Sequence, residues 1–322
     1  MKAIVYYNYG PPDVLKCEEI EKPTLADDEV LIKVRAASVN PIDRFFRGRP
    51  YLMRIMTGLR KPKYTRLGVD VAGQVEAVGR NVTEFKPGDE VFGACRGAFA
   101  EYACAPKSKL ALKPDNVTFE QAAAVPVAGL TALQGLRDKG KIQTVQKVLI
   151  NGAAGGVGTF AVQIAKSFGA DVTAVCSTRN MDMVRSIGAD PTIDYSREDF
   201  TKGTQRYDLI FDLVANHSLL ACRRVMNPTG IYIAAGIISL GESMIRILAH
   251  MIATIVLPRF VSQNFVTFIA KINQADLTVM RELMATGKVT PVIDKRYSLS
   301  EVHEAVRYLE AKHARGKVVI TL

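Results

Sequence analysis

The stretch Gln146-Lys-Val-Leu-Ile-Asn-Gly-Ala-Ala-Gly-Gly-Val-Gly-Thr-Phe-Ala-Val-Gln-Ile-Ala-Lys166 joins an apolar run, a glycine-rich turn and the start of a helical pattern. Residues 148–150 form the apolar run. Residues 160–165 place apolar side chains on one side of a helix that ends at Gly169. The pattern predicts a buried strand that leads through a tight turn into a helix.

The turn itself follows the spacing A-x-G-x-x-G, with Ala153, Gly155 and Gly158 at the three marked positions. Without a Cβ atom at Gly155, backbone N–H groups can approach phosphate oxygens, and Gly158 lets the helix pack close to the strand. Gly152 and Gly156 loosen the turn further. We therefore predict that these five residues bind the pyrophosphate of a dinucleotide; a glycine loop without a nucleotide is the alternative.

After this turn, strand and helix patterns alternate. A helix pattern runs through Ile187, and the strand patterns cover residues 171–177, 192–195, 208–214 and 231–235. Such alternation is typical of α/β proteins. It predicts a Rossmann-type, doubly wound parallel sheet.

Before the turn, short strands are separated by turn signals such as Pro87-Gly88. The expected strands cover residues 3–7, 29–37, 73–78, 90–93, 99–105 and 110–112. They predict an all-β unit, a partly open barrel. A helix is expected over 118–136.

The chain ends with an expected strand at 290–292, a helix at 299–310 and a strand at 317–322. These elements are too few to stand alone, so we expect the last strand to rejoin the N-terminal β unit. The predicted divisions are 1–123 for the β unit, 124–285 for the parallel sheet and 286–322 for the returning segment.

Composition indicates a soluble globular protein with two domains. The chain has 322 residues, of which 48% are hydrophobic and 23% charged. The five cysteines are scattered and form no C-x-x-C pair, so they predict neither a disulfide framework nor a metal knuckle. The N-terminal residues form a strand pattern rather than a signal peptide, and we expect a cytoplasmic protein.

The net charge of +10 is concentrated between Asp43 and Asp70, where eight Lys and Arg residues occur without an acidic residue. Aromatic side chains interleave with them. Three interpretations are open for this basic stretch, residues 44–66: a solvated loop, a field that attracts an anionic cofactor, or a surface that binds RNA or a membrane.

Taken together, these segments resemble the medium-chain dehydrogenase/reductase superfamily, and within it the zinc-independent quinone oxidoreductase branch of zeta-crystallin type. The resemblance implies a GroES-like barrel beside the Rossmann sheet. Besides the glycine turn, the matching segments are residues 37–43, 67–73, 85–91, 130–136 and 315–320.

The branch is indicated by missing metal ligands. Zinc dehydrogenases of the superfamily carry a cysteine where this chain has Asn40, and Gly-His-Glu where it has Gly68-Val69-Asp70. We therefore expect no metal. Hydride transfer to a quinone or an α,β-unsaturated carbonyl needs no Lewis acid, because hydrogen-bond donors can hold the charge that develops on oxygen. The alternatives are an enoyl-thioester reductase of the same superfamily, or a non-catalytic cofactor-binding protein that uses the basic stretch.

The residues after the second predicted strand indicate the cofactor preference. An NAD enzyme usually carries an acidic residue there, about 20 residues past the turn. This chain has Ser177-Thr178-Arg179-Asn180 instead. Arg179 can pair with a 2′-phosphate and Ser177 can donate a hydrogen bond to it. By resemblance, Tyr195 contacts the same phosphate. We predict NADP(H).

The resemblance implies the remaining contacts. Asn40 and Thr131 would border the nicotinamide and its ribose and are the candidate catalytic residues, together with Tyr51. Members of the branch often have a tyrosine near the position of Phe45. Because phenylalanine has no hydroxyl, Tyr51 or water would supply the proton. The other expected cofactor contacts are Val157, Val214, Ala235, Gly236 and Phe268.

The apolar stretch 244–257 is a second departure from the family pattern. As a helix it would be about 21 Å long, shorter than the roughly 30 Å hydrocarbon core of a bilayer. It could be a core or dimer contact, a lid over an apolar pocket, or an interfacial membrane helix. The expected partners are a small quinone or enone and, by resemblance, a second copy of the chain. No nucleic acid is expected, and peripheral membrane contact is the less favoured option.

Overall fold

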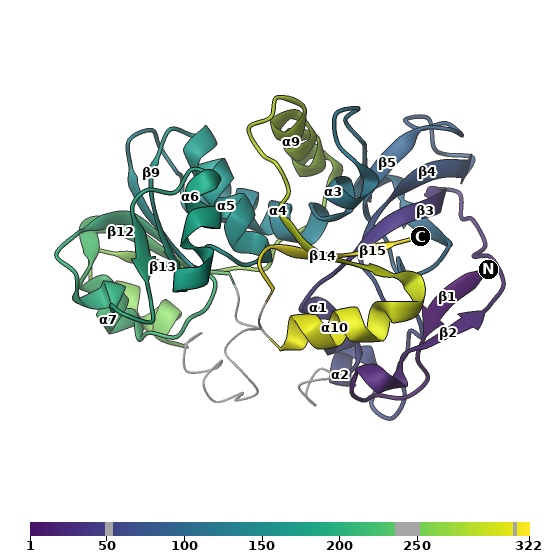
Figure 1. Cartoon of the computed structure of the whole chain (residues 1–322), viewed down its shortest axis with the longest axis horizontal. Coiled ribbons are helices and arrows are strands. Elements are labelled where there is room, and N and C mark those ends of the chain that lie inside the picture. Colours follow the sequence, from purple (N-terminus) through teal and green to yellow (C-terminus); the bar gives the residue numbers. More distant parts are fainter. Residues whose placement is uncertain (49–53, 236–251, 312–313) are drawn as a thin grey trace. The chain divides into compact units, whose positions relative to one another are not determined.

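The computed structural model describes residues 1–48, 54–235, 252–311 and 314–322. It divides the chain into two compact units (Figure 1). Unit 1 comprises residues 1–130 and 272–322, and unit 2 comprises residues 131–271. The first unit is therefore discontinuous in sequence, as predicted for a C-terminal segment that rejoins the β unit.

Unit 2 is built on six parallel strands in the order β10-β9-β8-β11-β12-β13. Numbered from β8, this is the Rossmann order 3-2-1-4-5-6. The strands are β8 (Lys147–Asn151), β9 (Asp171–Cys176), β10 (Thr192–Asp194), β11 (Tyr207–Asp212), β12 (Met226–Ala234) and β13 (Asn264–Thr267). The doubly wound parallel sheet is confirmed.

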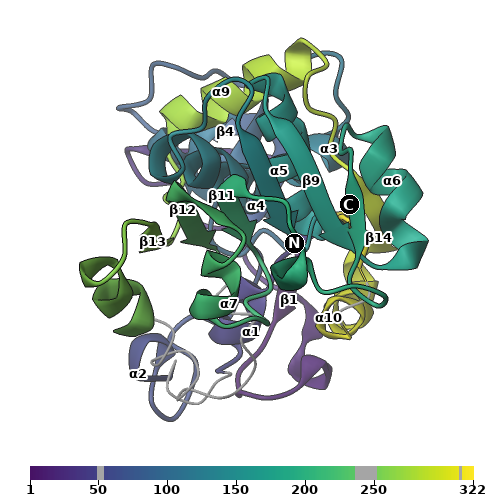
Figure 2. The same cartoon turned by 90° about the vertical axis from the view of Figure 1, so that its left-hand side faces the viewer.

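Helices cover this sheet, so its central strands are buried on both faces. Helix α5 (Gly156–Ser167) packs on β8 and β9, α6 (Met181–Ser186) packs on β10, and α7 (Leu219–Arg223) packs on β12 (Figures 1 and 2). Four of the five residues of β8 are buried, which explains why the sequence shows an apolar run there instead of an alternating pattern.

Unit 1 contains a seven-stranded sheet in which only the β14–β15 pair is parallel. The strands are β3 (Glu29–Val39), β4 (Asp70–Val78), β5 (Glu90–Ala94), β6 (Tyr102–Pro106), β7 (Leu110–Leu112), β14 (Ile293–Ser298) and β15 (Lys317–Thr321). The long strand β3 pairs with β6 through its first half and with β15 through its second half. β1 (Lys2–Val5) and β2 (Lys16–Glu19) form a separate hairpin.

The return of the chain end to this unit is confirmed by the antiparallel pairing of β15 with β3, in which Ile320 lies opposite Ala37. Helix α10 (Val302–Glu310) packs on β14 and β15 (Figure 1) and buries Val302, Ala305 and Val306 in the core of unit 1. The C-terminal strand therefore completes the first unit.

Two expected elements differ in the structure. The strand expected at 290–292 lies instead at β14, residues 293–298, whose polar sequence hides it from an apolar pattern. The helix expected over 118–136 is three segments: α3 (Phe119–Ala123), α4 (Pro126–Leu133) and a π-helical turn over Gln134–Lys139. Pro126 has no N–H to continue the preceding helix, so a new one begins there.

The division between the units also differs from the expected boundaries after residues 123 and 285. Helix α9 (Gln274–Ala285) packs against β7. The side-chain Nδ2 of Asn116 donates a 3.1 Å hydrogen bond to the carbonyl of Met284. Because its partners lie in the β unit, α9 belongs to unit 1 although its sequence follows the parallel sheet.

Candidate active site

Six of the predicted cofactor contacts in unit 2 share one position in the fold, within two residues of the end of a parallel strand. Because the six strands are parallel, their carboxyl ends meet at one edge of the sheet. The residues beyond strands β8 to β13, in that order, are Gly152, Ser177, Tyr195, Val214, Ala235 and Phe268. Gly236 lies outside the described residues.

At this edge, the glycine turn has a backbone that only small residues allow. Gly152 has a φ of 86°, in the left-handed region. A Cβ atom on Gly158 would lie 2.2 Å from the Gly152 carbonyl oxygen, so α5 and the turn meet where no side chain fits. Ala153, at the first position of the pattern, is fully buried and does not have a positive φ. The alanine is therefore compatible with the turn, because Gly152 takes the left-handed conformation.

Helix α5 begins directly after Gly155, so its first N–H groups point out of the turn without partners in the helix. Gly155, Gly156 and Val157 are partly exposed, and the first turn of α5 carries no acidic side chain. The positive end of the helix dipole adds to these donors. This arrangement suits a phosphate group.

A buried carboxylate, Asp212 at the end of β11, holds the loop that follows this strand. It accepts hydrogen bonds from Asn151 Nδ2 at 2.9 Å, from the backbone N–H groups of Val214 and Ala215, and from the Tyr232 hydroxyl at 2.8 Å. Burial and the neighbouring Asp212 raise the pKa of Tyr232, which keeps this hydroxyl a donor.

The loop that Asp212 holds is in contact range of the glycine turn. A Cβ atom on Gly152 would lie 2.8 Å from Val214 Cγ2. Asp212 was not predicted from the sequence, although an aspartate that closes an apolar strand is a signal that could have found it.

The predicted phosphate-binding residues lie at the ends of neighbouring strands β9 and β10. Arg179 and Tyr195 are exposed, and Ser177 is partly exposed. Ser177 Oγ accepts a 3.1 Å hydrogen bond from Asn180 Nδ2, which leaves the hydroxyl hydrogen available as a donor. The Tyr195 N–H binds the Cys176 carbonyl at 3.1 Å. A guanidinium, a hydroxyl and a phenol are therefore presented from adjoining strand ends.

A carboxylate that the sequence analysis overlooked, Asp194, lies between them but is buried. The hydroxyl of Thr178 donates to it, and so do the hydroxyl and N–H of Ser196 at 2.7 and 3.0 Å. These hydrogen bonds, first that of Thr178, lower its pKa to about 2. Because Arg197 also lies 3.7 Å away, the negative charge is largely compensated within unit 2.

Thr131 and Phe268 lie in segments of unit 2 that are held together. Gln134, one turn after Thr131, donates from Nε2 to the Lys271 carbonyl at 2.6 Å and accepts from the Lys271 N–H at 3.0 Å. A Cβ atom on Gly135 would lie 3.2 Å from the Phe268 ring. The structure thus brings the helix of Thr131 alongside residues 268–271.

In unit 1, Asn40 lies in a buried polar cluster. It is 3% exposed. Its Nδ2 donates to Asp70 Oδ2 at 2.9 Å and to the Ser38 carbonyl at 3.2 Å, and its Oδ1 accepts from Lys317 Nζ at 2.7 Å. Asn40 is at the predicted place after β3, but its amide is engaged inside the unit. Its contact with the cofactor stays a prediction.

Asp43 belongs to the same cluster and has an unusual titration. The Asn40 N–H donates to Asp43 Oδ2 at 2.8 Å. Complete burial raises the pKa of Asp43 from 3.8 to about 7, and the nearby carboxylate of Asp70 adds to the effect. The pKa of Lys317 is lowered, also by burial. The cluster therefore combines one buried cation with two buried carboxyl groups.

No group of three or more His, Cys, Asp and Glu side chains that could hold a metal ion occurs in the described parts of the chain. At the positions where the zinc enzymes were expected to carry ligands, Asn40 and Asp70 instead share the ammonium of Lys317, at 2.7 and 3.3 Å. The side chains present there are suited to an ammonium rather than to zinc.

The interpretation of the basic stretch as wholly solvated is wrong for Arg47. This side chain is 1% exposed, pairs with Glu310 and donates to the Gly10 carbonyl at 3.0 Å. Arg60 and Lys61 are exposed. Tyr51, the candidate proton donor, lies outside the described residues.

Of the apolar stretch 244–257, only the last six residues are described. Residues 252–256 are helical, and Ile252 and Ile255 are exposed. Nowhere in the described ranges does a helix have the length and apolar character needed to cross a membrane. The three interpretations of this stretch stay open.

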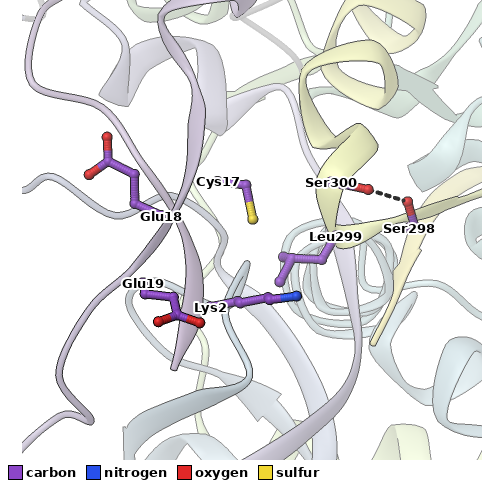
Figure 3. Close-up of a pocket in the computed structure, with 7 residues that line it drawn as sticks. All are labelled: Lys2, Cys17, Glu18, Glu19, Ser298, Leu299 and Ser300. Carbon is purple, nitrogen blue, oxygen red and sulfur yellow. Dashed lines mark hydrogen bonds between the residues drawn. The ribbon is translucent and has the colours of Figure 1, made fainter.

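A small hollow of unit 1 lies apart from the predicted residues. It has a volume of about 290 Å³, and Figure 3 shows Lys2 and Cys17, from β1 and β2, turned toward Leu299 at the beginning of the segment before α10. None of its lining residues was predicted to bind a cofactor or substrate, and it plays no part in the function derived below.

The six-stranded parallel sheet and the glycine turn after its first strand define unit 2 as a dinucleotide-binding unit of Rossmann type. Two family profiles match the chain: "Alcohol dehydrogenase GroES-like domain" over residues 26–115, and "Zinc-binding dehydrogenase" over residues 187–320. The GroES-like character of unit 1 is thereby confirmed.

Relatives cover nearly the whole chain. The 2-methylene-furan-3-one reductase of Solanum lycopersicum is 35% identical, and the chloroplastic NADPH-dependent alkenal/one oxidoreductase of Arabidopsis thaliana is 34% identical; each match covers 99% of this chain and 79% of the relative. The quinone oxidoreductase structure from Coxiella burnetii is 31% identical with a TM-score of 0.86, and covers 100% of this chain and 99% of that one. This chain belongs to the medium-chain dehydrogenase/reductase superfamily, in its quinone oxidoreductase-like branch.

Proposed function

We propose that the protein is an NADPH-dependent oxidoreductase that transfers hydride to a quinone or an α,β-unsaturated carbonyl without a metal ion. The observation that carries the proposal is the edge of the sheet in unit 2. There the glycine turn is joined by exposed Arg179 and Tyr195 and by Ser177, while the nearby carboxylate of Asp194 is buried and hydrogen-bonded. The names of the Arabidopsis and Coxiella relatives support the same cofactor and substrate classes.

The residues of this chain bind and orient the reactants. Bound NADPH supplies the hydride. The N–H groups at the beginning of α5 would hold the pyrophosphate, and Arg179 would pair with the 2′-phosphate. Asp212 keeps Val214 against the turn. The negative charge left on the substrate oxygen requires only hydrogen-bond donors and, finally, a proton from water or Tyr51.

The test is a substrate panel with purified protein, in which NADPH and NADH consumption are followed with a quinone, an enone and an enoyl thioester. We expect NADPH to be oxidised with the quinone or enone and to bind more tightly than NADH. Turnover confined to the enoyl thioester would favour the thioester reductase instead. Tight NADPH binding without any turnover would favour a non-catalytic role, and failure to bind either cofactor would refute all three.

The structure gives less support to the alternative in which the basic stretch binds RNA or a membrane. Although Arg60 and Lys61 are exposed, Arg47 is withdrawn from the basic stretch by its buried pair with Glu310. If the alternative were right, Arg60→Glu with Lys61→Glu would abolish a salt-dependent interaction with RNA or liposomes and leave turnover unchanged.

We also propose a homodimer in the cytoplasm. β13 ends the described sheet of unit 2, and a strand at a sheet edge presents unpaired backbone groups to a second copy. The five cysteines are free, as expected in a reducing compartment. Light scattering during size-exclusion chromatography measures the molar mass, and a monomer would contradict the dimer.

A further inference from the structure

Lys317, in the last strand, is a cation in the interior of unit 1. Its side chain is 3% exposed, and its neighbours Asn40 and Asp70 are 3% and 0% exposed. Burial of an ammonium is unfavourable unless it is paired and hydrogen-bonded. Lys317 therefore needs partners, and the structure provides one carboxylate and one amide oxygen.

These contacts determine which way the amide of Asn40 points. Lys317 Nζ can only donate, so the atom that faces it at 2.7 Å must be the amide oxygen. The amide nitrogen then uses its two hydrogens toward Asp70 Oδ2 and the Ser38 carbonyl. A flipped amide would place NH₂ against an ammonium and oxygen against a carboxylate. Without the ammonium, one of these two constraints is lost.

Asp70 extends the same hydrogen-bond network to a helix. Its Oδ2 accepts from Ser38 Oγ at 2.7 Å as well as from Asn40 and Lys317, and its Oδ1 accepts from the Val127 N–H at 3.0 Å. Val127 is in the first turn of α4, the helix in which Thr131 follows one turn later. One carboxylate thus ties the end of β3 to the beginning of α4.

We propose that Lys317 is a positioning residue for hydride transfer. It fixes the amide of Asn40 directly. Through Asp70 it fixes the first turn of α4, the helix that continues to Thr131, so it acts on both segments that carry the predicted nicotinamide contacts. The proposal rests on the function proposed above. Lys317 touches neither substrate nor cofactor in this role; it acts through its two neighbours.

The test replaces the ammonium by an apolar side chain of similar length, Lys317→Met. The matched control is Lys113→Met, because Lys113 is also buried in unit 1 and its Nζ is held by Glu90, Pro114 and Val117. Both variants should lower the melting temperature. Only Lys317→Met should lower kcat, on the order of 10–100-fold, with a larger isotope effect from 4-deuterated NADPH, because misplacement slows the chemical step.

A measurement without cofactor separates positioning from catalysis. Hydrogen exchange at the Val127 amide should accelerate in Lys317→Met and stay unchanged in Lys113→Met. Lys317→Arg, which keeps a donor cation, should retain more of both the protection and kcat. If Lys317→Met fails to fold, the double variant with Asp70→Asn removes the uncompensated carboxylate, and its kcat should still be low.

Two results would overturn the proposal. If Lys317→Met loses stability as Lys113→Met does but keeps kcat, the isotope effect and Val127 protection, Lys317 is only structural. If the wild-type protein neither binds nor oxidises NADPH, the proposed function fails and the positioning role falls with it. The wild-type measurement distinguishes these two failures.

Discussion

At the carboxyl edge of the sheet in unit 2, the turn from Gly152 to Gly158 offers backbone donors and carries no ionisable side chain. Around Asn40 in unit 1, by contrast, ionisable side chains fill the interior. The turn leaves no room for the Cβ atom of residue 158, whereas the cluster depends on the charge of Lys317. The two regions should therefore respond to opposite changes: the turn to added atoms, and the cluster to removed charge.

The strongest challenge to the turn is Gly158→Ala. The new Cβ atom would meet the Gly152 carbonyl at 2.2 Å and the Ala153 backbone at 2.7 Å, so α5 must move away from the turn. We expect NADPH affinity, measured by fluorescence titration, to fall by more than about 100-fold. Gly203→Ala, whose Cβ atom would lie 3.4 Å from the Phe200 carbonyl, is the control and should bind normally. Unchanged affinity in Gly158→Ala would show that the turn does not hold the cofactor.

A change of charge at the same edge should have a smaller effect on cofactor affinity, and the effect should be selective for NADPH. Arg179→Glu should weaken NADPH binding by about 10–100-fold, the range of a lost charged hydrogen bond, and NADH binding much less. Arg206→Glu is the control, since Arg206 is exposed just before β11, at the opposite edge of the sheet. Equal losses for both cofactors would mean that the 2′-phosphate binds elsewhere.

The smallest effect concerns pH, and it distinguishes the regions by sign. Asp43, in unit 1, has a pKa raised to about 7, so the folded protein holds this proton more tightly than the unfolded chain. Its contribution makes the free energy of unfolding fall as pH rises from about 4 to about 7, by at most about 1.4 kcal/mol per pH unit. Asp43→Asn should remove this slope in urea denaturation.

Asp194, in unit 2, is the counterpart. Its pKa is lowered to about 2, so its stabilisation is present above about pH 4 and is lost as pH falls toward 2. Asp194→Asn should reduce stability at pH 5 and flatten the acid limb, with no change between pH 5 and 7. If the two substitutions removed pH-dependent contributions of the same sign, this contrast would be contradicted.

The edge of the sheet in unit 2 could be predicted because its logic is local. The end of each strand can be recognised in the sequence, and parallel pairing brings these ends together, so the sequence alone places Gly152, Ser177 and Val214 at this edge. The inward turn of the Asn40 amide could not be predicted. It depends on Lys317, which is 277 positions away, and no periodicity links the two.

The local features that the sequence analysis missed consist of polar residues. β14 reads Ile-Asp-Lys-Arg-Tyr-Ser and lacks the apolar run that marks strands such as β8 and β11. Asp212 and Asp194 close buried strands and organise the edge, but a search for exposed binding residues passes over carboxylates that serve the fold.

The discontinuity of unit 1 has a consequence for synthesis of the chain. When a ribosome has made residue 271, all of unit 2 exists, but β14 and β15 do not. Unit 2 can then fold as it emerges, while β3 lacks its β15 partner and Asp70 lacks its ammonium. The unit that begins first is thus completed last, because β15 and its Lys317 follow all of unit 2 in the sequence.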